Sequence, residues 1–168
     1  MIGAAAAGTR IPSLGPRGEG WVVLQLACLG LVAAGCVFVP GPDASGGYAV
    51  AGAIGAPIAI VGLLLTLWAV FVLNRARSLT AVPYPTDDGS LVETGPYRFM
   101  RHPIYAALIL IAAGSSISRA SLPAIVASIA LALVLDLKRR REEAWLTQRF
   151  PGYPAYRART RALVPFLY

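Results

Sequence analysis

The sequence contains little charge, only two cysteines and a single histidine. Charged residues make up 14% of the 168 positions and hydrophobic residues 57%, whereas soluble domains carry about 25% charge. This balance excludes an ordinary soluble domain and indicates a membrane protein. Cys28 and Cys36 have no metal-site spacing and form no disulfide framework. We therefore expect no metal centre and interpret both cysteines as small apolar packing residues between helices.

Basic residues outnumber acidic ones, and their positions matter more than their sum. Lys and Arg total 15 against 8 Asp and Glu, and eight of the fifteen lie within residues 138–161. Such a block beside an apolar run is typical of the cytoplasmic flank of a membrane helix rather than of a nucleic-acid face. The sequence thus predicts a lipid bilayer as partner and no nucleic acid.

Two long uncharged runs fill the first half of the chain. A Gly/Ala/Pro-rich tail over residues 1–20 precedes Trp21–Val39, which has 19 residues with Gln25 as its only polar side chain, and then Tyr48–Leu73, which has 26. A membrane span needs about 20 residues, so residues 21–73 are expected to form two transmembrane helices. A cleavable signal peptide is the alternative for the first run. The second run holds small residues at helical spacing that permit close helix contact: Gly52, Gly55, Ala56, Ala59 and Gly62.

The second half of the chain begins with a long polar segment, residues 74–102, which we expect to be a cytoplasmic loop with a function. Residues 103–137 predict a transmembrane helical hairpin with its turn at Ser118–Ser121. Good helix formers continue past the apolar run, so Leu122–Arg149 could be one continuous helix. Residues 138–168 are then a cytoplasmic C-terminal segment.

These segments predict an all-α fold: a polytopic membrane helical bundle with about four transmembrane helices, a C-terminal helical hairpin and a cytoplasmic C-terminal segment. Four spans place fourteen of the fifteen basic residues on one side and leave only Arg119 on the other. By the positive-inside bias that side is cytoplasmic. We expect an integral protein of a bacterial inner membrane with both termini in the cytoplasm, and the oligomeric state stays open.

Two polar clusters fall where the predicted hairpin meets the cytoplasm. One surrounds His102, and the other contains Asp136, Arg140, Glu142 and Glu143. Ionisable residues at such a junction are functional candidates. In the simpler alternative, the first cluster is a basic membrane flank and the two glutamates only neutralise neighbouring basic residues at helical spacing.

The polar clusters carry a family resemblance. Gly95-Pro96-Tyr97-Arg98, followed by Arg101-His102-Pro103-Ile104-Tyr105, resembles the signature of the isoprenylcysteine carboxyl methyltransferase and phospholipid methyltransferase families. Their second signature is similar to Glu142-Glu143 with its following residues, which are Leu146, Phe150, Tyr153, Tyr156 and Arg161-Ala162-Leu163-Val164-Pro165. The resemblance covers about residues 88–165. One departure is Ala107, where the phospholipid enzymes usually have Gly.

The resemblance implies an integral membrane methyltransferase whose S-adenosylmethionine lies in a cytoplasmic-side pocket closed by the C-terminal segment. It implies six cofactor-binding residues, which are Tyr97, His102, Pro103, Tyr105, Glu142 and Glu143. It assigns the catalytic role to Arg101 and, secondarily, to Arg98, as cations that hold an acceptor carboxylate. His102 would then face the cofactor and Arg101 the acceptor.

The expected acceptor is a lipidic or prenylated small molecule or peptide embedded in the membrane. An isoprenylcysteine-like carboxylate is favoured because it needs no general base and because Ala107 departs from the phospholipid branch. A phospholipid amine N-methyltransferase, a relative of the sterol-type NADPH reductases and a non-catalytic small membrane protein are the alternatives.

Overall fold

The computed structural model describes residues 11–39, 41, 47–80, 82 and 90–164. Across these ranges the chain forms five α-helices and a short 3-10 helix, with no strand beyond one isolated bridge. The helices are α1 (Glu19–Phe38), α2 (Gly47–Arg75), η1 (Gly95–Arg98), α3 (Pro103–Ser118), α4 (Leu122–Arg149) and α5 (Tyr153–Arg159). The all-α prediction is confirmed, as is the prediction that one helix runs from Leu122 to Arg149.

Two helices, α1 and α2, are long and apolar enough to cross a membrane, and α3 is a shorter apolar helix. Only 17% of the most apolar window of α1 and 11% of that of α2 is buried within the protein. Large exposed apolar surfaces of this kind require an apolar surrounding. The structure therefore supports membrane association through α1 and α2.

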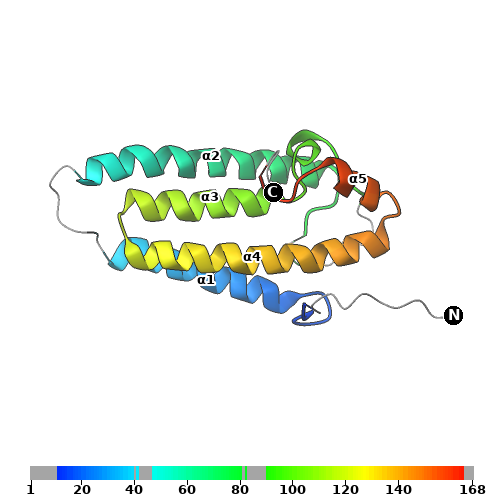
Figure 1. Ribbon diagram of the computed structural model, residues 1–168, viewed down its shortest axis with the longest axis horizontal. Coiled ribbons are helices and arrows are strands. Elements are labelled where there is room, and N and C mark those ends of the chain that lie inside the picture. Colours follow the sequence, from blue (N-terminus) through cyan, green and yellow to red (C-terminus); the bar gives the residue numbers. More distant parts are fainter. Residues whose placement is uncertain (1–10, 40, 42–46, 81, 83–89, 165–168) are drawn as a thin grey trace.

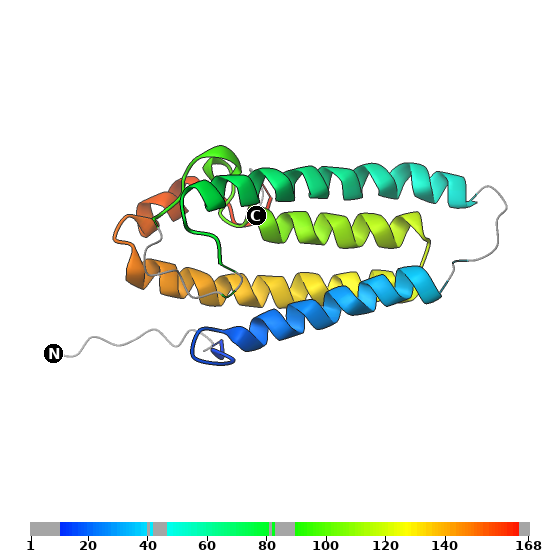
Figure 2. The ribbon, with the colours of Figure 1, turned by 180° about the vertical axis from the view of Figure 1, so that it is seen from behind.

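The four long helices form a bundle of two pairs. α2 packs mainly on α3 and α1 mainly on α4, and contacts between α3 and α4 join the pairs. Figures 1 and 2 show that α4 extends well past the start of α3 at one end of the bundle, where η1 and α5 gather. The turn between α3 and α4 lies at the opposite end. All segments that carry the two sequence signatures therefore meet at one end of the bundle.

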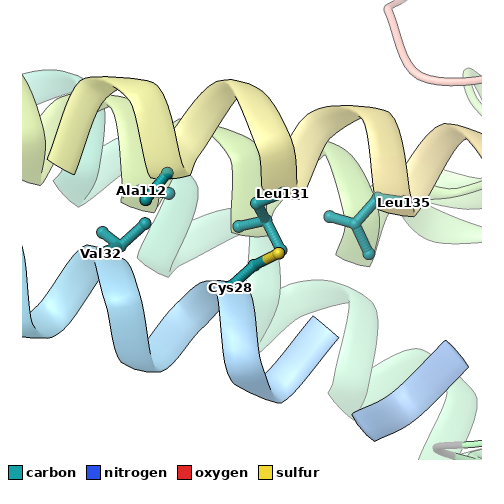
Figure 3. Packing of buried hydrophobic residues seen from close by; sticks show 6 residues of the cluster. Cys28, Val32, Ala112, Leu131 and Leu135 are labelled. Atoms are coloured by element: carbon teal, nitrogen blue, oxygen red, sulfur yellow. The ribbon is translucent and has the colours of Figure 1, made fainter. Parts of the chain in front are cut away.

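The apolar core lies where α1, α3 and α4 meet (Figure 3). Leu131 and Leu135 of α4 are fully buried there. Cys28 and Val32 of α1 pack against them, and both cysteines are free thiols. The interpretation of Cys28 as an apolar packing residue is confirmed.

The contact between α2 and α3 depends on the predicted small residues. A Cβ atom on Gly62 would lie 2.8 Å from the carbonyl oxygen of Ala107, and a Cβ atom on Gly55 would clash with the backbone of Gly114 and Ser118. Backbones can approach this closely only where no side chain intervenes. The small-residue packing predicted for this run is confirmed at Gly55 and Gly62.

We expect Gly55→Ala to destabilise the protein by roughly 1–3 kcal/mol, because the clash is with rigid backbone. Gly52→Ala is the matched control on the same helix, since a Cβ atom there meets nothing within 4 Å. The control should leave stability unchanged or slightly higher, because Ala favours the helix. Thermal unfolding in detergent measures both variants. Equal midpoints would contradict the close contact between α2 and α3.

Candidate functional site

The local sequence around His102 fixes the start of α3. Pro103 occupies the first turn of the helix, where its missing N–H needs no partner. Before it, η1 begins at Gly95, whose φ of +59° favours glycine. A Cβ atom at Gly95 would also lie 2.8 Å from the Val72 side chain. The first signature thus folds into a short 3-10 helix that leads directly into α3.

A cavity of about 370 Å³ lies at this end of the bundle, within the size range of small-molecule sites. Residues of all four long helices line it, together with residues of η1, of the segment between α2 and η1, and of the C-terminal segment. The lining residues are Val22, Gln25, Leu26, Leu73, Ser78, Thr80, Ser90, Leu91, Val92, Tyr97, Arg101, His102, Ile104, Tyr105, Lys138, Glu142, Leu146, Phe150, Tyr153 and Tyr156. Both signatures therefore contribute to one cavity.

The predicted site residues divide into two groups. The structure brings five of them to the cavity wall, which are Tyr97, Arg101, His102, Tyr105 and Glu142. The other three do not line it. Pro103 is buried at the start of α3, Arg98 is exposed on η1, and Glu143 is buried with 4% exposure.

Glu142 is the acidic group of the wall, and its position is set by two neighbours on the first signature. The Tyr105 hydroxyl donates to Glu142 Oε2 at 2.7 Å. His102 Nδ1 lies 3.6 Å from the same oxygen, and the His102 and Tyr105 rings stack with centroids 5.3 Å apart. The carboxylate is therefore held on the cavity wall by two side chains one turn apart.

Glu143 lies behind this wall, and four basic side chains surround its carboxylate. Arg101 Nε donates to its Oε1 at 3.0 Å, and His102 Nε2 lies 3.2 Å from the same atom. Arg139 and Arg157 approach within 3.7 and 3.6 Å. The simpler alternative, in which the glutamates neutralise basic residues at helical spacing, thus describes one contact of Glu143 among several. Glu143 thus joins α4 to α5 and to the two residues that precede α3.

Arg101 attaches the C-terminal segment to the first signature. Its Nη1 donates to the carbonyl oxygens of Arg157, at 3.3 Å, and Thr160. The backbone pairs as well, with Arg101 N–H donating to Arg161 O at 2.8 Å and His102 N–H to Ala162 O at 3.0 Å. The guanidinium that the sequence suggested for an acceptor carboxylate is therefore engaged by Glu143 and by backbone carbonyls.

Three tyrosines complete the wall: Tyr97 comes from η1, and Tyr153 and Tyr156 come from α5. The Tyr156 hydroxyl donates to the carbonyl oxygen of Tyr97 at 2.6 Å. The Tyr153 hydroxyl is buried and has no hydrogen-bond partner within the described part of the chain. Burial raises the pKa of Tyr97, Tyr153 and Tyr156, and nearby glutamates add to the rise. All three phenols are therefore protonated hydrogen-bond donors.

Sequence reasoning assigned no site role to five other polar residues of the cavity, which are Gln25, Ser78, Thr80, Ser90 and Lys138. Lys138 was interpreted as part of a basic membrane flank, yet it is 2% exposed and donates to Gln25 Oε1 at 2.8 Å. The available signal was Gln25 itself, the only polar side chain of its apolar run. A polar residue in such a run is a functional candidate.

The pKa of Glu143 predicts an acid-sensitive contact. Burial raises this pKa, but hydrogen bonds and positive charge from His102 and Arg101 more than offset it and lower the value from 4.5 to about 2. A lowered pKa stabilises the fold above pH 4.5, and this contribution is lost as pH falls toward 2.

We therefore expect wild type to lose about 2 kcal/mol relative to Glu143→Gln between pH 6 and pH 3. Thermal unfolding of both proteins in detergent across this range measures the difference. Parallel pH profiles would show that Glu143 is not held ionised by the contacts described.

Comparison with known proteins gives two kinds of match. Residues 50–152 match the protein family described as phospholipid methyltransferase. The nickel-cobalt-cadmium resistance protein NccN of Alcaligenes xylosoxydans xylosoxydans is 31% identical over 118 residues, which is 69% of this chain and 49% of that protein. The cobalt-zinc-cadmium resistance protein CzcN of Cupriavidus metallidurans is 30% identical, over 69% of this chain and 48% of that protein. The chain spans about half the length of these curated relatives.

Proposed function

The chain belongs to the phospholipid methyltransferase family, a family of integral membrane methyltransferases, and from this premise we propose that it transfers a methyl group from S-adenosylmethionine to a lipidic acceptor. The observation that carries the proposal is the single cavity shared by the two signatures, with His102 and Tyr105 on one wall and Glu142 on the facing helix. The sterol-type reductase and non-catalytic alternatives gain no support from the family match.

The residues of the cavity fit the cofactor in their chemistry. S-adenosylmethionine carries an ammonium, a carboxylate, a ribose diol and a sulfonium, and when bound it supplies an electrophilic methyl group. Glu142 can accept from the ammonium or the diol. The buried Tyr153 hydroxyl, without a partner in the described residues, can donate to the cofactor. Of the predicted contacts, we propose that Tyr97, His102, Tyr105 and Glu142 bind the cofactor directly and that Pro103 and Glu143 position them.

The chain's own contribution to the reaction is positioning and exclusion of water. The Glu142 carboxylate favours a cationic ligand such as a sulfonium over an anionic one. The C-terminal segment, held by Arg101 and by Tyr156, places Tyr153 and Phe150 across the cavity. Alignment of donor and acceptor in a closed site accounts for much of the rate of such displacements.

For the acceptor we propose a carboxylate on a lipidic or prenylated molecule, because a carboxylate needs no proton acceptor. The family description favours a second candidate, the amine of a phospholipid. The two differ in product, since a methyl ester is cleaved by base and an N-methyl group is not.

Incubation of the purified protein with methyl-labelled S-adenosylmethionine and native membranes tests the proposal. We expect label in the lipid or prenylated-protein fraction and release of most of it as methanol on base treatment. Base-stable label would favour the phospholipid amine. No labelling, together with no binding of S-adenosylhomocysteine, would refute a methyltransferase function.

We further propose four membrane spans, in α1, α2, α3 and the part of α4 before Lys138, with the cavity on the cytoplasmic side. The basic asymmetry of the sequence supports this orientation. A cysteine introduced at Arg119 in a Cys28/Cys36-free background should be labelled from outside the cell, and one at Gly152 should not. Labelling of the cysteine at position 152 from outside would show that the topology is the reverse of the one proposed.

A further inference from the structure

The described wall of the cavity differs in chemistry from side to side. α1 and α2 contribute Val22, Leu26 and Leu73, with Gln25 as the one polar side chain of that part of the wall. The part formed by α4 and the start of α3 carries His102 and Glu142 of the proposed cofactor site. An apolar wall formed by the two most lipid-exposed helices suits an acyl or prenyl chain.

Lys138 lies between these two parts of the wall. It precedes Glu142 by one turn of α4, and both residues line the cavity. Its Nζ donates to Gln25 Oε1 at 2.8 Å and lies 5.2 Å from the centroid of the Tyr105 ring. An amide oxygen and an aromatic face both stabilise the protonated amine. Burial lowers the pKa of Lys138, and the negative charge of Glu142 opposes this fall. Lys138 therefore presents an oriented amine where the apolar wall meets the cofactor site.

From this placement we infer that Lys138, oriented by Gln25, binds the anionic oxygens of the lipidic acceptor while its hydrocarbon chain lies against Val22, Leu26 and Leu73. This inference rests on the proposed function, because a methyl acceptor is bound only if the protein is a methyltransferase. The anionic group is the carboxylate of a prenylated or fatty acid or the phosphate of a phospholipid, which share the charge-assisted hydrogen bonds that an ammonium donates. Lys138 thereby takes the role that the sequence assigned to Arg101, whose guanidinium is engaged elsewhere.

Binding of three single-chain amphiphiles to the purified full chain in neutral detergent tests the inference without requiring turnover. Dodecyl phosphate, dodecanoate and dodecanol have the same chain length and differ in the head group. The wild type should bind the better anionic probe about 10-fold or more tightly than dodecanol. The ranking of phosphate against carboxylate then distinguishes the two acceptor classes.

Lys138→Gln should abolish this preference while keeping an amide beside Gln25, and Lys138→Arg should restore most of it. Arg140→Gln is the matched control, since Arg140 lies on the same helix, pairs with Asp136 at 2.8 Å and does not line the cavity. The control should keep the preference. Binding of S-adenosylhomocysteine should change by less than about twofold in all three variants.

Three outcomes would overturn the inference: no anionic preference in the wild type, an equal loss in Arg140→Gln, or a Lys138→Gln protein that retains the preference. A parallel loss of S-adenosylhomocysteine binding in Lys138→Gln would assign Lys138 to the cofactor instead. If S-adenosylhomocysteine fails to bind even the wild type while the Lys138-dependent preference persists, the proposed function fails and the anion site stands. If Lys138→Gln does not fold, the absence of an anionic preference in the wild type still overturns the inference.

Discussion

Glu142→Gln should weaken the binding of S-adenosylhomocysteine by about 1.5–3 kcal/mol, or roughly 10- to 150-fold. The carboxylate lines the cavity and is held by the Tyr105 hydroxyl at 2.7 Å. Glutamine keeps the size and one accepting oxygen but removes the charge that strengthens a hydrogen bond from the ammonium or the ribose diol, both of which S-adenosylhomocysteine retains. Isothermal titration of the purified protein measures the change.

Asp136→Asn is the control for Glu142→Gln. Asp136 is a carboxylate on the same helix, paired with Arg139 and Arg140, and is not part of the cavity wall. Its replacement should leave the affinity within about twofold. Equal affinities of wild type and Glu142→Gln would remove Glu142 from the cofactor site.

The second large effect is expected at Arg101. Arg101→Lys keeps the charge but loses the planar fork, which in this structure joins Glu143 to the carbonyl oxygens of Arg157 and Thr160. We expect the C-terminal segment to open at least about 10-fold more often, corresponding to a loss of about 1.5 kcal/mol. Turnover should fall with it, because Tyr153 and Tyr156 belong to that segment.

Limited trypsin digestion separates this role from that of an acceptor clamp. Cleavage after Arg157, Arg159 and Arg161 should accelerate in Arg101→Lys, because cleavage follows the population of the open segment when opening is fast. Arg98→Lys is the control, since Arg98 is exposed on η1, and it should digest like the wild type. Unchanged digestion of Arg101→Lys with reduced turnover would instead support the carboxylate clamp expected from the sequence.

Much of the bundle follows from features that act over short stretches of sequence. Apolar length predicted α1 and α2, Pro103 marked the start of α3, and good helix formers carried α4 to Arg149. Gly55 and Gly62 marked the face of α2 that meets α3, because only small residues allow that approach. The proximity of His102 and Glu142 could also be predicted from the sequence, because a tight hairpin places the ends of its two helices side by side.

The roles of neighbouring residues could not be predicted in the same way. Glu142 and Glu143 differ by about 100° around α4, and only the packing of α4 decides which one faces the cavity. The partners of Arg101 include backbone carbonyls. Every residue has such a carbonyl, so the residue types in the sequence do not indicate which ones Arg101 contacts. Lys138 and Gln25 are 113 positions apart, and neither belongs to the signatures that indicated the site.

The backbone pairing of Arg101 and His102 with Arg161 and Ala162 has a consequence for the order of assembly. Once the chain has been synthesised through Arg149, α1 to α4 and the core around Leu131 can already form. The N–H groups of Arg101 and His102 still lack their carbonyl partners at that point, because these partners lie 60 residues further along the chain. The helices can therefore pack before the cavity has its complete wall, because Phe150, Tyr153 and Tyr156 join that wall only with the C-terminal segment.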